Sequence, residues 1–320
     1  MGLKSTLNAI RKAFQRKRKP VYRFENSGPR RCQFEWMEER RMLTADPVVV
    51  GITYFEMDDG ADGVPDQFQI TFTGGAAGTE LTRLIIGADQ FGDGYSNGDM
   101  IFDTIEDPNS LGVDHAHPFK IVSNSGITSV KATVVDGGSK LILDFVGFHA
   151  GDKLIFSIDV DEVQKARSGD IATQNSGLDP VASGAEFEDT RIEATFKANG
   201  YHDVVAEGRF VNAYDPVFAG HNLDLPSDNF DGSRDRSAGA LTTAQQLEKP
   251  ISIEGHVFVD ADRDNVRDAG ETPLAGVTLS LWRKEGNTYV NTGYTATTDA
   301  NGRYVFGKEL NLLPGVYQIR

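Results

Sequence analysis

Twelve residues near the C-terminal end decide the fold: Asp260-Ala-Asp262-Arg-Asp264-Asn265-Val266-Arg-Asp268-Ala-Gly-Glu271. Counted from the first, carboxylates stand at positions one, three, five, nine and twelve, and position seven offers a backbone carbonyl. Five acidic side chains this close repel one another unless a cation neutralises them. A hard divalent ion with roughly six to eight oxygen ligands fits this spacing. The sequence therefore predicts a calcium site whose ligands are Asp260, Asp262, Asp264, Val266, Asp268 and Glu271.

The flanks of this loop predict strands. The ligand order is that of an EF-hand-type loop, although Asn265 stands where such a loop has glycine. Asparagine tolerates a left-handed backbone better than most residues, so the turn can still form. True EF-hand loops join helices, whereas residues 251–259 and 276–281 alternate and are rich in β-branched side chains. The alternative is an acidic turn that is solvated and holds no ion.

A family resemblance rests on three motifs in the C-terminal 70 residues. They are G-H-V-F-V-D-A-D-R-D-N-V-R-D-A-G-E-T-P-L-A-G-V-T-L from Gly255, T-T-D-A-N-G-R-Y-V-F from Thr297 and L-P-G-V-Y from Leu313. Together they resemble the B-type modules of serine-aspartate-repeat surface proteins. The resemblance implies a prealbumin-like β-sandwich over residues 250–320, calcium in the acidic loop, and a spacer or stalk role outside the cell. Asn265 departs from the glycine usual in that family.

The charge of the chain is strongly asymmetric. Residues 1–41 contain twelve Lys or Arg and four Glu, whereas the rest contains 20 basic and 43 acidic residues, a net charge of −23. Such a body repels nucleic acid and attracts divalent cations, so we expect no nucleic-acid partner. The single cysteine, Cys32, lies in the basic segment, so no intramolecular disulfide can form.

Residues 1–46 are interpreted as a basic targeting leader outside the folded body. An apolar stripe between basic residues is formed by Leu3, Leu7, Ile10 and Phe14. This pattern predicts either a helix at an anionic membrane or a disordered basic arm. From Phe34 the sequence F-E-W-M-E-E-R-R-M-L-T-A resembles a short N-terminal motif of planctomycete surface proteins, which implies export. No apolar run approaches the roughly 18 residues of a transmembrane segment. We expect an extracellular, secreted or surface-associated protein.

The middle of the chain predicts an all-β domain. Short alternating runs separated by Gly, Asp and Asn are expected to be strands at 48–55, 67–72, 81–86, 129–135, 140–146, 153–160, 191–196 and 201–210. They predict a β-sandwich over residues 47–215 and leave jelly-roll connectivity open. Residues 216–249 lack periodicity and are interpreted as a linker. The expected fold is thus two β-sandwich domains after the leader, with the second truncated at Arg320.

Three other polar clusters are weaker metal candidates. The motif D-G-V-P-D within Asp58–Asp66 resembles the calcium-rich repeats of thrombospondin type 3, although one copy alone is present. The oxygen-rich run Asp89–Asp99 matches no known ligand spacing and is interpreted as a turn. Asp114, His115 and His117 could hold zinc, but an exposed loop explains them better without a third clear ligand.

The sequence favours binding over catalysis. It contains no G-x-S-x-G, H-E-x-x-H or Walker-type motif, so we expect a non-enzymatic surface, adhesion or scaffold protein with a calcium-stabilised spacer. Its partners are then calcium and cell-wall or extracellular-matrix proteins or glycans. The alternative is a secreted carbohydrate-active enzyme or carbohydrate-binding protein that uses the middle sandwich. Its candidate stacking aromatics are Tyr54, Phe91, Tyr95 and Trp36.

Overall fold

The computed structural model describes residues 45–57, 63–212, 236–261 and 266–320. These residues form antiparallel sheets, with one short helix, α2 (Ile171–Asn175), and a 3₁₀ turn at Lys308–Leu310. The predicted all-β fold class is therefore confirmed. Residues 1–44 of the predicted leader, with Trp36, lie outside the described residues, whereas Asp46, placed in the leader by the sequence, already belongs to the first strand of the sandwich.

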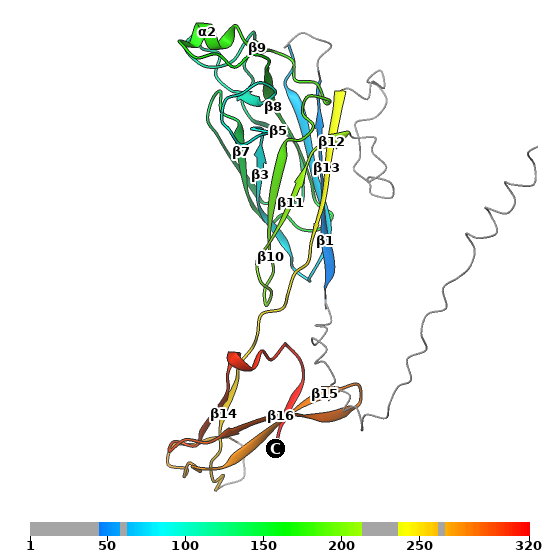
Figure 1. Ribbon diagram of the computed structural model, residues 1–320. Coiled ribbons are helices and arrows are strands. Elements are labelled where there is room, and N and C mark those ends of the chain that lie inside the picture. The colour runs from blue at the N-terminus through cyan, green and yellow to red at the C-terminus, as the bar shows by residue number, and fades with distance from the viewer. Residues whose placement is uncertain (1–44, 58–62, 213–235, 262–265) are drawn as a thin grey trace, which may run out of the picture. The chain divides into compact units, whose positions relative to one another are not determined.

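Two sheets face each other in the first domain (Figure 1). The larger has the order β12–β13–β1–β2–β8–β4, and β5 and β9 also pair with β8. The smaller has the order β11–β10–β3–β7–β6. The larger sheet contains β1 (Asp46–Phe55), β2 (Asp66–Gly75), β4 (Met100–Asp103), β5 (Lys120–Ser125), β8 (Lys153–Val163), β9 (Leu178–Asp179), β12 (Val211–Asn212) and β13 (Ser237–Ala244). The smaller contains β3 (Glu80–Gly87), β6 (Ser129–Val134), β7 (Lys140–Val146), β10 (Arg191–Lys197) and β11 (Val204–Arg209).

Alternation along the strands places one aromatic row between the sheets. Tyr54 in β1 pairs with Phe68 in β2, which pairs with Phe156 in β8, and all three are fully buried. The rings of Phe68 and Phe156 stack with centroids 4.9 Å apart. Phe187 covers this row and stacks on Tyr54 with centroids 4.1 Å apart. Each such ring removes a large apolar area from water, which is the main driving force for this fold.

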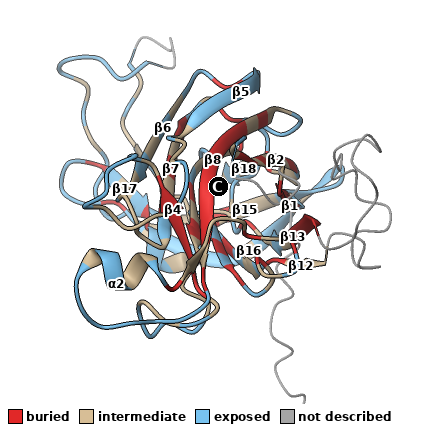
Figure 2. Cartoon of the chain, turned by 90° about the horizontal axis from the view of Figure 1, so that it is seen from above, coloured by how far each residue is buried: buried red, intermediate tan, exposed pale blue. Residues whose placement is uncertain are grey.

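Two of the sandwich strands that the sequence did not predict, β4 and β5, have short or polar sequences. Strand β4 has four residues and follows the oxygen-rich loop, so no alternation can be seen in it. Strand β5 includes Ser123, Asn124 and Ser125 and is exposed along its whole length. Figure 2 shows the contrast between exposed β5 and the buried residues of β8 and β4. Pairing with β8 determines the position of both strands, and a local pattern could not show it.

The predicted linker over residues 216–249 is wrong in its second half. Residues 237–244 form β13, which pairs with β1 from Phe55↔Ser237 to Val48↔Ala244 and so belongs to the sandwich. The apolar face of β13 is made of Ala238 and Ala240, both fully buried. Alanine and glycine carry little strand propensity, so this segment resembled a loop in the sequence. Residues 213–235 lie outside the described residues.

The C-terminal module has its own small core. Strand β14 (Ile253–His256) pairs with β17 (Arg303–Phe306), and β15 (Thr278–Glu285) lies between β16 (Thr288–Thr297) and β18 (Tyr317–Ile319). Leu281, Phe306 and Leu312 are the buried centre. The strands predicted on both sides of the acidic loop are therefore present, as β14 and β15.

Gln246, just after β13, gives a test of the corrected boundary. Its Oε1 accepts hydrogen bonds from the Ala76 amide at 2.9 Å and the Thr79 hydroxyl at 2.8 Å, and the residue is 1 % exposed. Gln246→Ala leaves the buried amide of Ala76 without its acceptor, whereas the Thr79 hydroxyl can still donate to the Ala76 carbonyl at 2.7 Å, and the free energy of unfolding should fall by about 1–3 kcal/mol. Urea unfolding monitored by fluorescence measures the change. The exposed Thr243→Ala is the control and should change it by less than about 0.5 kcal/mol, and equal effects would refute the boundary.

Candidate functional site

The acidic loop is closed at its base by backbone pairing. The Val259 amide donates to the Thr272 carbonyl at 2.9 Å, and Phe258 forms an isolated antiparallel bridge with Pro273. Asp260 and Glu271, the first and twelfth positions, therefore follow and precede paired residues. The closed base brings the two ends of the predicted ligand set to one place.

Glu271 reaches across the loop with both carboxylate oxygens. Oε1 accepts the amide of Ala261 at 2.9 Å, and Oε2 accepts the amide of Asp268 at 3.1 Å. The Glu271 amide donates to the Asp268 carbonyl at 3.3 Å. One half-buried side chain thus joins the entering and leaving arms of the loop. A carboxylate has about four lone-pair sites, so these two bonds leave capacity for a cation.

The remaining predicted ligands are only partly described. Asp260 is half-buried, Asp268 is exposed, and Val266 is 56 % exposed. Asp262 and Asp264 lie outside the described residues, together with Asn265. The donor set of carboxylates and one carbonyl consists of hard oxygens, which suits calcium and does not suit a thiophilic metal. The described half of the loop fits the ion that the sequence predicts.

The motif T-T-D-A-N-G-R has a structural role. Asp299 Oδ1 accepts the amides of Asn301 at 2.8 Å and Arg303 at 2.9 Å, and these bonds lower the pKa of the Asp299 carboxyl. Gly302 has φ of 72°, and a Cβ there would lie 2.3 Å from the carbonyl oxygen of Val257. Glycine is therefore required where this turn meets the strand that leads into the acidic loop.

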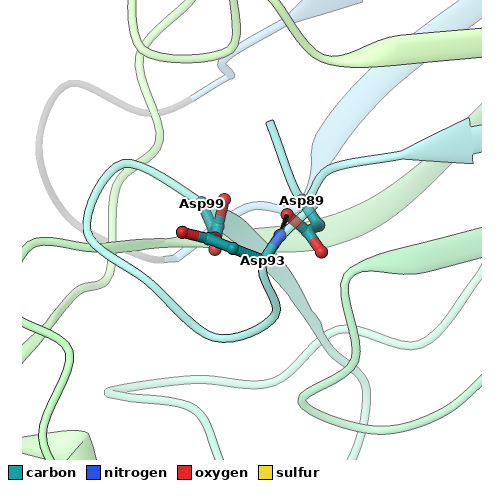
Figure 3. Close-up of side chains that lie close together, drawn as sticks. All are labelled: Asp89, Asp93 and Asp99. Carbon is teal, nitrogen blue, oxygen red and sulfur yellow. Dashed lines mark hydrogen bonds between the residues drawn. The ribbon is translucent and has the colours of Figure 1, made fainter. Parts of the chain in front are cut away.

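A second carboxylate cluster appears in the sandwich, in the loop that joins β3 to β4. Asp89, Asp93 and Asp99 each offer an oxygen within 4.8 Å of the others, and they are the one such group among the described residues (Figure 3). Asp89 accepts the amides of Gly92 at 2.5 Å, Asp93 at 3.2 Å and Gly94 at 3.0 Å. The loop fold that brings them together depends on these local bonds, so ligand spacing in the sequence could not reveal it.

Asp99 is the buried member of this cluster. Burial raises the pKa of its carboxyl, the charge of Asp89 adds to the rise, and hydrogen bonds from Ser96 and Gln90 oppose it. Ser96 donates its amide at 2.7 Å and its hydroxyl at 3.0 Å to Oδ2, and the Gln90 amide donates to Oδ1 at 3.0 Å. The net effect is a carboxyl that protonates more readily in the folded protein than in the unfolded chain.

A cavity of about 700 Å³ adjoins Asp99 at the end of the sandwich where α2 lies. Its walls come from the loops around Tyr95, Leu111, Gly138 and Arg167. Burial, and then the charge of Asp161, raises the pKa of the Tyr95 hydroxyl. The volume is in the range of small-ligand sites, roughly 300–1,000 Å³.

The structure places the other predicted sugar-stacking aromatics and metal candidates in different environments. Tyr54 cannot stack on a sugar because it is fully buried, and its hydroxyl donates to the Ala182 carbonyl. Phe91, in contrast, is 65 % exposed. The imidazole of His115 lies 3.9 Å from the Glu106 carboxylate. Among the described residues, Asp114, His115 and His117 do not form a group of three ligand atoms close enough to hold zinc. Residues 58–62, with the first aspartate of D-G-V-P-D, lie outside the described residues, whereas Gly63 to Asp66 are described, and Asp66 begins β2 and is buried.

Comparison with known proteins assigns the C-terminal module. Residues 251–320 match the SdrD B-like domain. The match confirms the resemblance to B-type modules of serine-aspartate-repeat proteins. The curated "Serine-aspartate repeat-containing protein I" of Staphylococcus saprophyticus is 26% identical over 201 residues, which cover 57% of this chain. The aligned region spans only 10% of that relative's own length.

The β-sandwich of a B-like domain agrees with the sheets of residues 253–319. Within the described part of the chain, no helix is both long and apolar enough to cross a membrane.

Asp99 gives a pH test of the sandwich cluster. Because its pKa is higher in the folded protein, the free energy of unfolding should fall as pH rises from the ordinary aspartate pKa through the raised value. Asp99→Asn cannot ionise and should lose this part of the fall. Urea unfolding between about pH 4 and 7, without divalent cations, measures it. Ser96→Ala removes a bond to the carboxylate and should steepen the fall, and an identical profile for Asp99→Asn would contradict the assignment.

Proposed function

We propose that this chain is part of a non-enzymatic, extracellular surface protein in which the B-type module is a calcium-stabilised spacer. The observation that carries the proposal is Glu271, which joins both arms of a loop that is closed at its base. The acidic body, with a net charge of −23 after Arg41, supports a role in a medium that contains divalent cations. The proposed partners of this protein, as a protein of the surface or adhesion type, are cell-wall or matrix proteins and glycans.

The proposed ligands would act as one charge-neutralising set. They are Asp260, Asp262, Asp264, Asp268 and Glu271 through carboxylates, and Val266 through its carbonyl. Bound calcium supplies the positive charge that allows these carboxylates to approach one another. Glu271 also orients the loop, because its bonds to Ala261 and Asp268 hold the two arms in register.

Calcium would stabilise the module through linkage. An ion that binds the folded loop and not the unfolded chain stabilises the fold by about 2.7 kcal/mol at a hundredfold excess over Kd. Extracellular modules commonly hold calcium with Kd of about 0.1–1 mM, so the site would be filled where the ion is abundant. Calcium would add to a small core, because the buried centre of the module consists, among the described residues, of Leu281, Phe306 and Leu312 with partly buried side chains packed around them.

Removal of calcium should lower the melting temperature of the module. Differential scanning calorimetry of the full chain in excess calcium and in chelator measures the shift. Glu271→Gln keeps an oxygen that can accept the Ala261 amide but removes the charge, so it should abolish most of the calcium-dependent shift. Asp264→Ala should do the same.

Glu285→Gln is the matched control, because Glu285 lies at the end of β15 and is exposed. It removes the same charge from the same module and should leave the calcium response intact. A melting curve that is unchanged by chelator in the unsubstituted protein would refute the calcium proposal.

The cavity next to Asp99 favours carbohydrate binding as a second candidate. Tyr95 lines it, polar groups of Ser139 and Gln174 share its wall, and Phe91 is exposed on the same loop. Aromatic faces and hydrogen-bonding side chains are what a neutral sugar requires. The acidic surroundings disfavour polyanionic glycans.

Binding of the full chain to an array of neutral and anionic glycans tests this candidate. Neutral glycans should bind, and Tyr95→Ala should weaken the binding by about tenfold through loss of the aromatic wall. Tyr294→Ala removes a half-exposed tyrosine from the module, and it should not change the binding. An array without signal, or equal losses in both variants, would reject the sugar site.

A further inference from the structure

We propose that residues 245–250 form a stiff joint between the sandwich and the module. Residues 245–249 are anchored on the sandwich, so that Pro250 alone connects the two domains. This inference goes beyond the calcium proposal, because every anchoring contact lies in the sandwich. The contacts that support it join the residues after β13 to the β10–β11 turn and to the β2–β3 turn, all among the described residues.

Backbone pairing ties the departing chain to the β10–β11 turn. The amide of His202 donates to the Leu247 carbonyl at 2.8 Å, and the amide of Lys249 donates to the Gly200 carbonyl at 2.7 Å. Tyr201 and Glu248, between them, form an antiparallel bridge. Residues 247–249 are therefore held to the sandwich by an isolated bridge and two backbone hydrogen bonds beyond the end of β13.

Two glutamine side chains fix the residues just before this pairing. Gln246 is buried and accepts from Ala76 and Thr79, as described above. Gln245 Nε2 donates to the Ala45 carbonyl at 2.9 Å, at the start of β1. The departing chain is thus held at three separate places on the sandwich.

Asp203 adds an ionic contact on both sides of the pairing. Its carboxylate lies 3.2 Å from Lys197 Nζ in β10 and 4.0 Å from Lys249 Nζ in the departing chain. All three side chains are about half exposed, so each pair contributes little alone. Their placement matters more, because one carboxylate attracts a lysine from each of the paired segments.

Few torsions remain free in the joint. Ile251 already belongs to the module, since its amide donates to the Leu312 carbonyl at 2.8 Å. Pro250 has φ fixed by its ring, and a residue before proline is confined to extended conformations, which restricts Lys249. Rotation between the two domains is therefore limited to about three backbone torsions, far fewer than in a linker of 34 residues.

Nitrogen-15 relaxation of the full chain in calcium tests the joint. The sandwich and the module should report rotational correlation times that agree within about a fifth, as for one tumbling body. Insertion of about ten Gly and Ser residues between Lys249 and Pro250 should shorten the correlation time of the module by about half. If the unmodified chain already behaves like the insertion variant, the stiff joint is wrong.

Amide hydrogen exchange tests the anchoring contacts directly. The amides of His202 and Lys249 should be protected, and Asp203→Asn should speed their exchange by about threefold or more. Asp144→Asn is the control, because it removes an exposed ion pair with Arg83 elsewhere in the sandwich and should leave both amides unchanged. Unprotected amides at both positions would overturn the proposal. These amides lie in the sandwich, so a failed calcium test in Glu271→Gln would not affect the result.

Discussion

Face-to-face packing of two sheets around phenylalanine rings is the interaction on which the rest of the sandwich depends. Phe68 contacts Phe156 and Phe187, and Phe72 contacts Phe196, through stacked or edge-on rings, and all five residues are 0–1 % exposed. Burial of such rings supplies most of the stabilising free energy of a domain with no disulfide available to it. Strands that this core holds in register carry the Asp89–Asp99 loop, the loops around the cavity, and residues 245–250, which lead to the module.

The sequence was sufficient for features that depend on a local pattern. Alternation in β2 and β8 places every second side chain inward, so the strands and the all-β class could be predicted. The B-type module was predictable because its loop has fixed ligand spacing. Strand β13 was not, because Ala238, Gly239 and Ala240 form a strand through pairing with β1 and β12 and not through a local pattern. The cluster of Asp89, Asp93 and Asp99 depends likewise on a loop conformation that no known spacing encodes.

The many acids of this chain serve first as hydrogen-bond acceptors in turns. Asp170 accepts the amide of Thr173 at 2.9 Å, Asp152 that of His149 at 2.8 Å, and Asp107 that of Asn109 at 2.8 Å. Aspartate favours such turns because its short side chain reaches backbone amides nearby. Acidic composition is therefore partly a consequence of long loops between strands, and the number of acids alone cannot indicate metal sites.

Glu271 differs from these acceptors in the distance between the groups that it joins. Asp107, Asp152 and Asp170 accept amides two or three residues away, whereas Glu271 accepts the amide of Ala261, ten residues earlier, as well as that of Asp268. A bond across the loop can hold the two arms together while the aspartates between them repel one another. The same carboxylate keeps lone pairs for a cation, so its hydrogen bonds would not compete with the proposed calcium binding. Pre-formed loop ends lower the entropy lost when the ion binds, and this is the physical reason to expect calcium to act on the stability of the module and not on its topology.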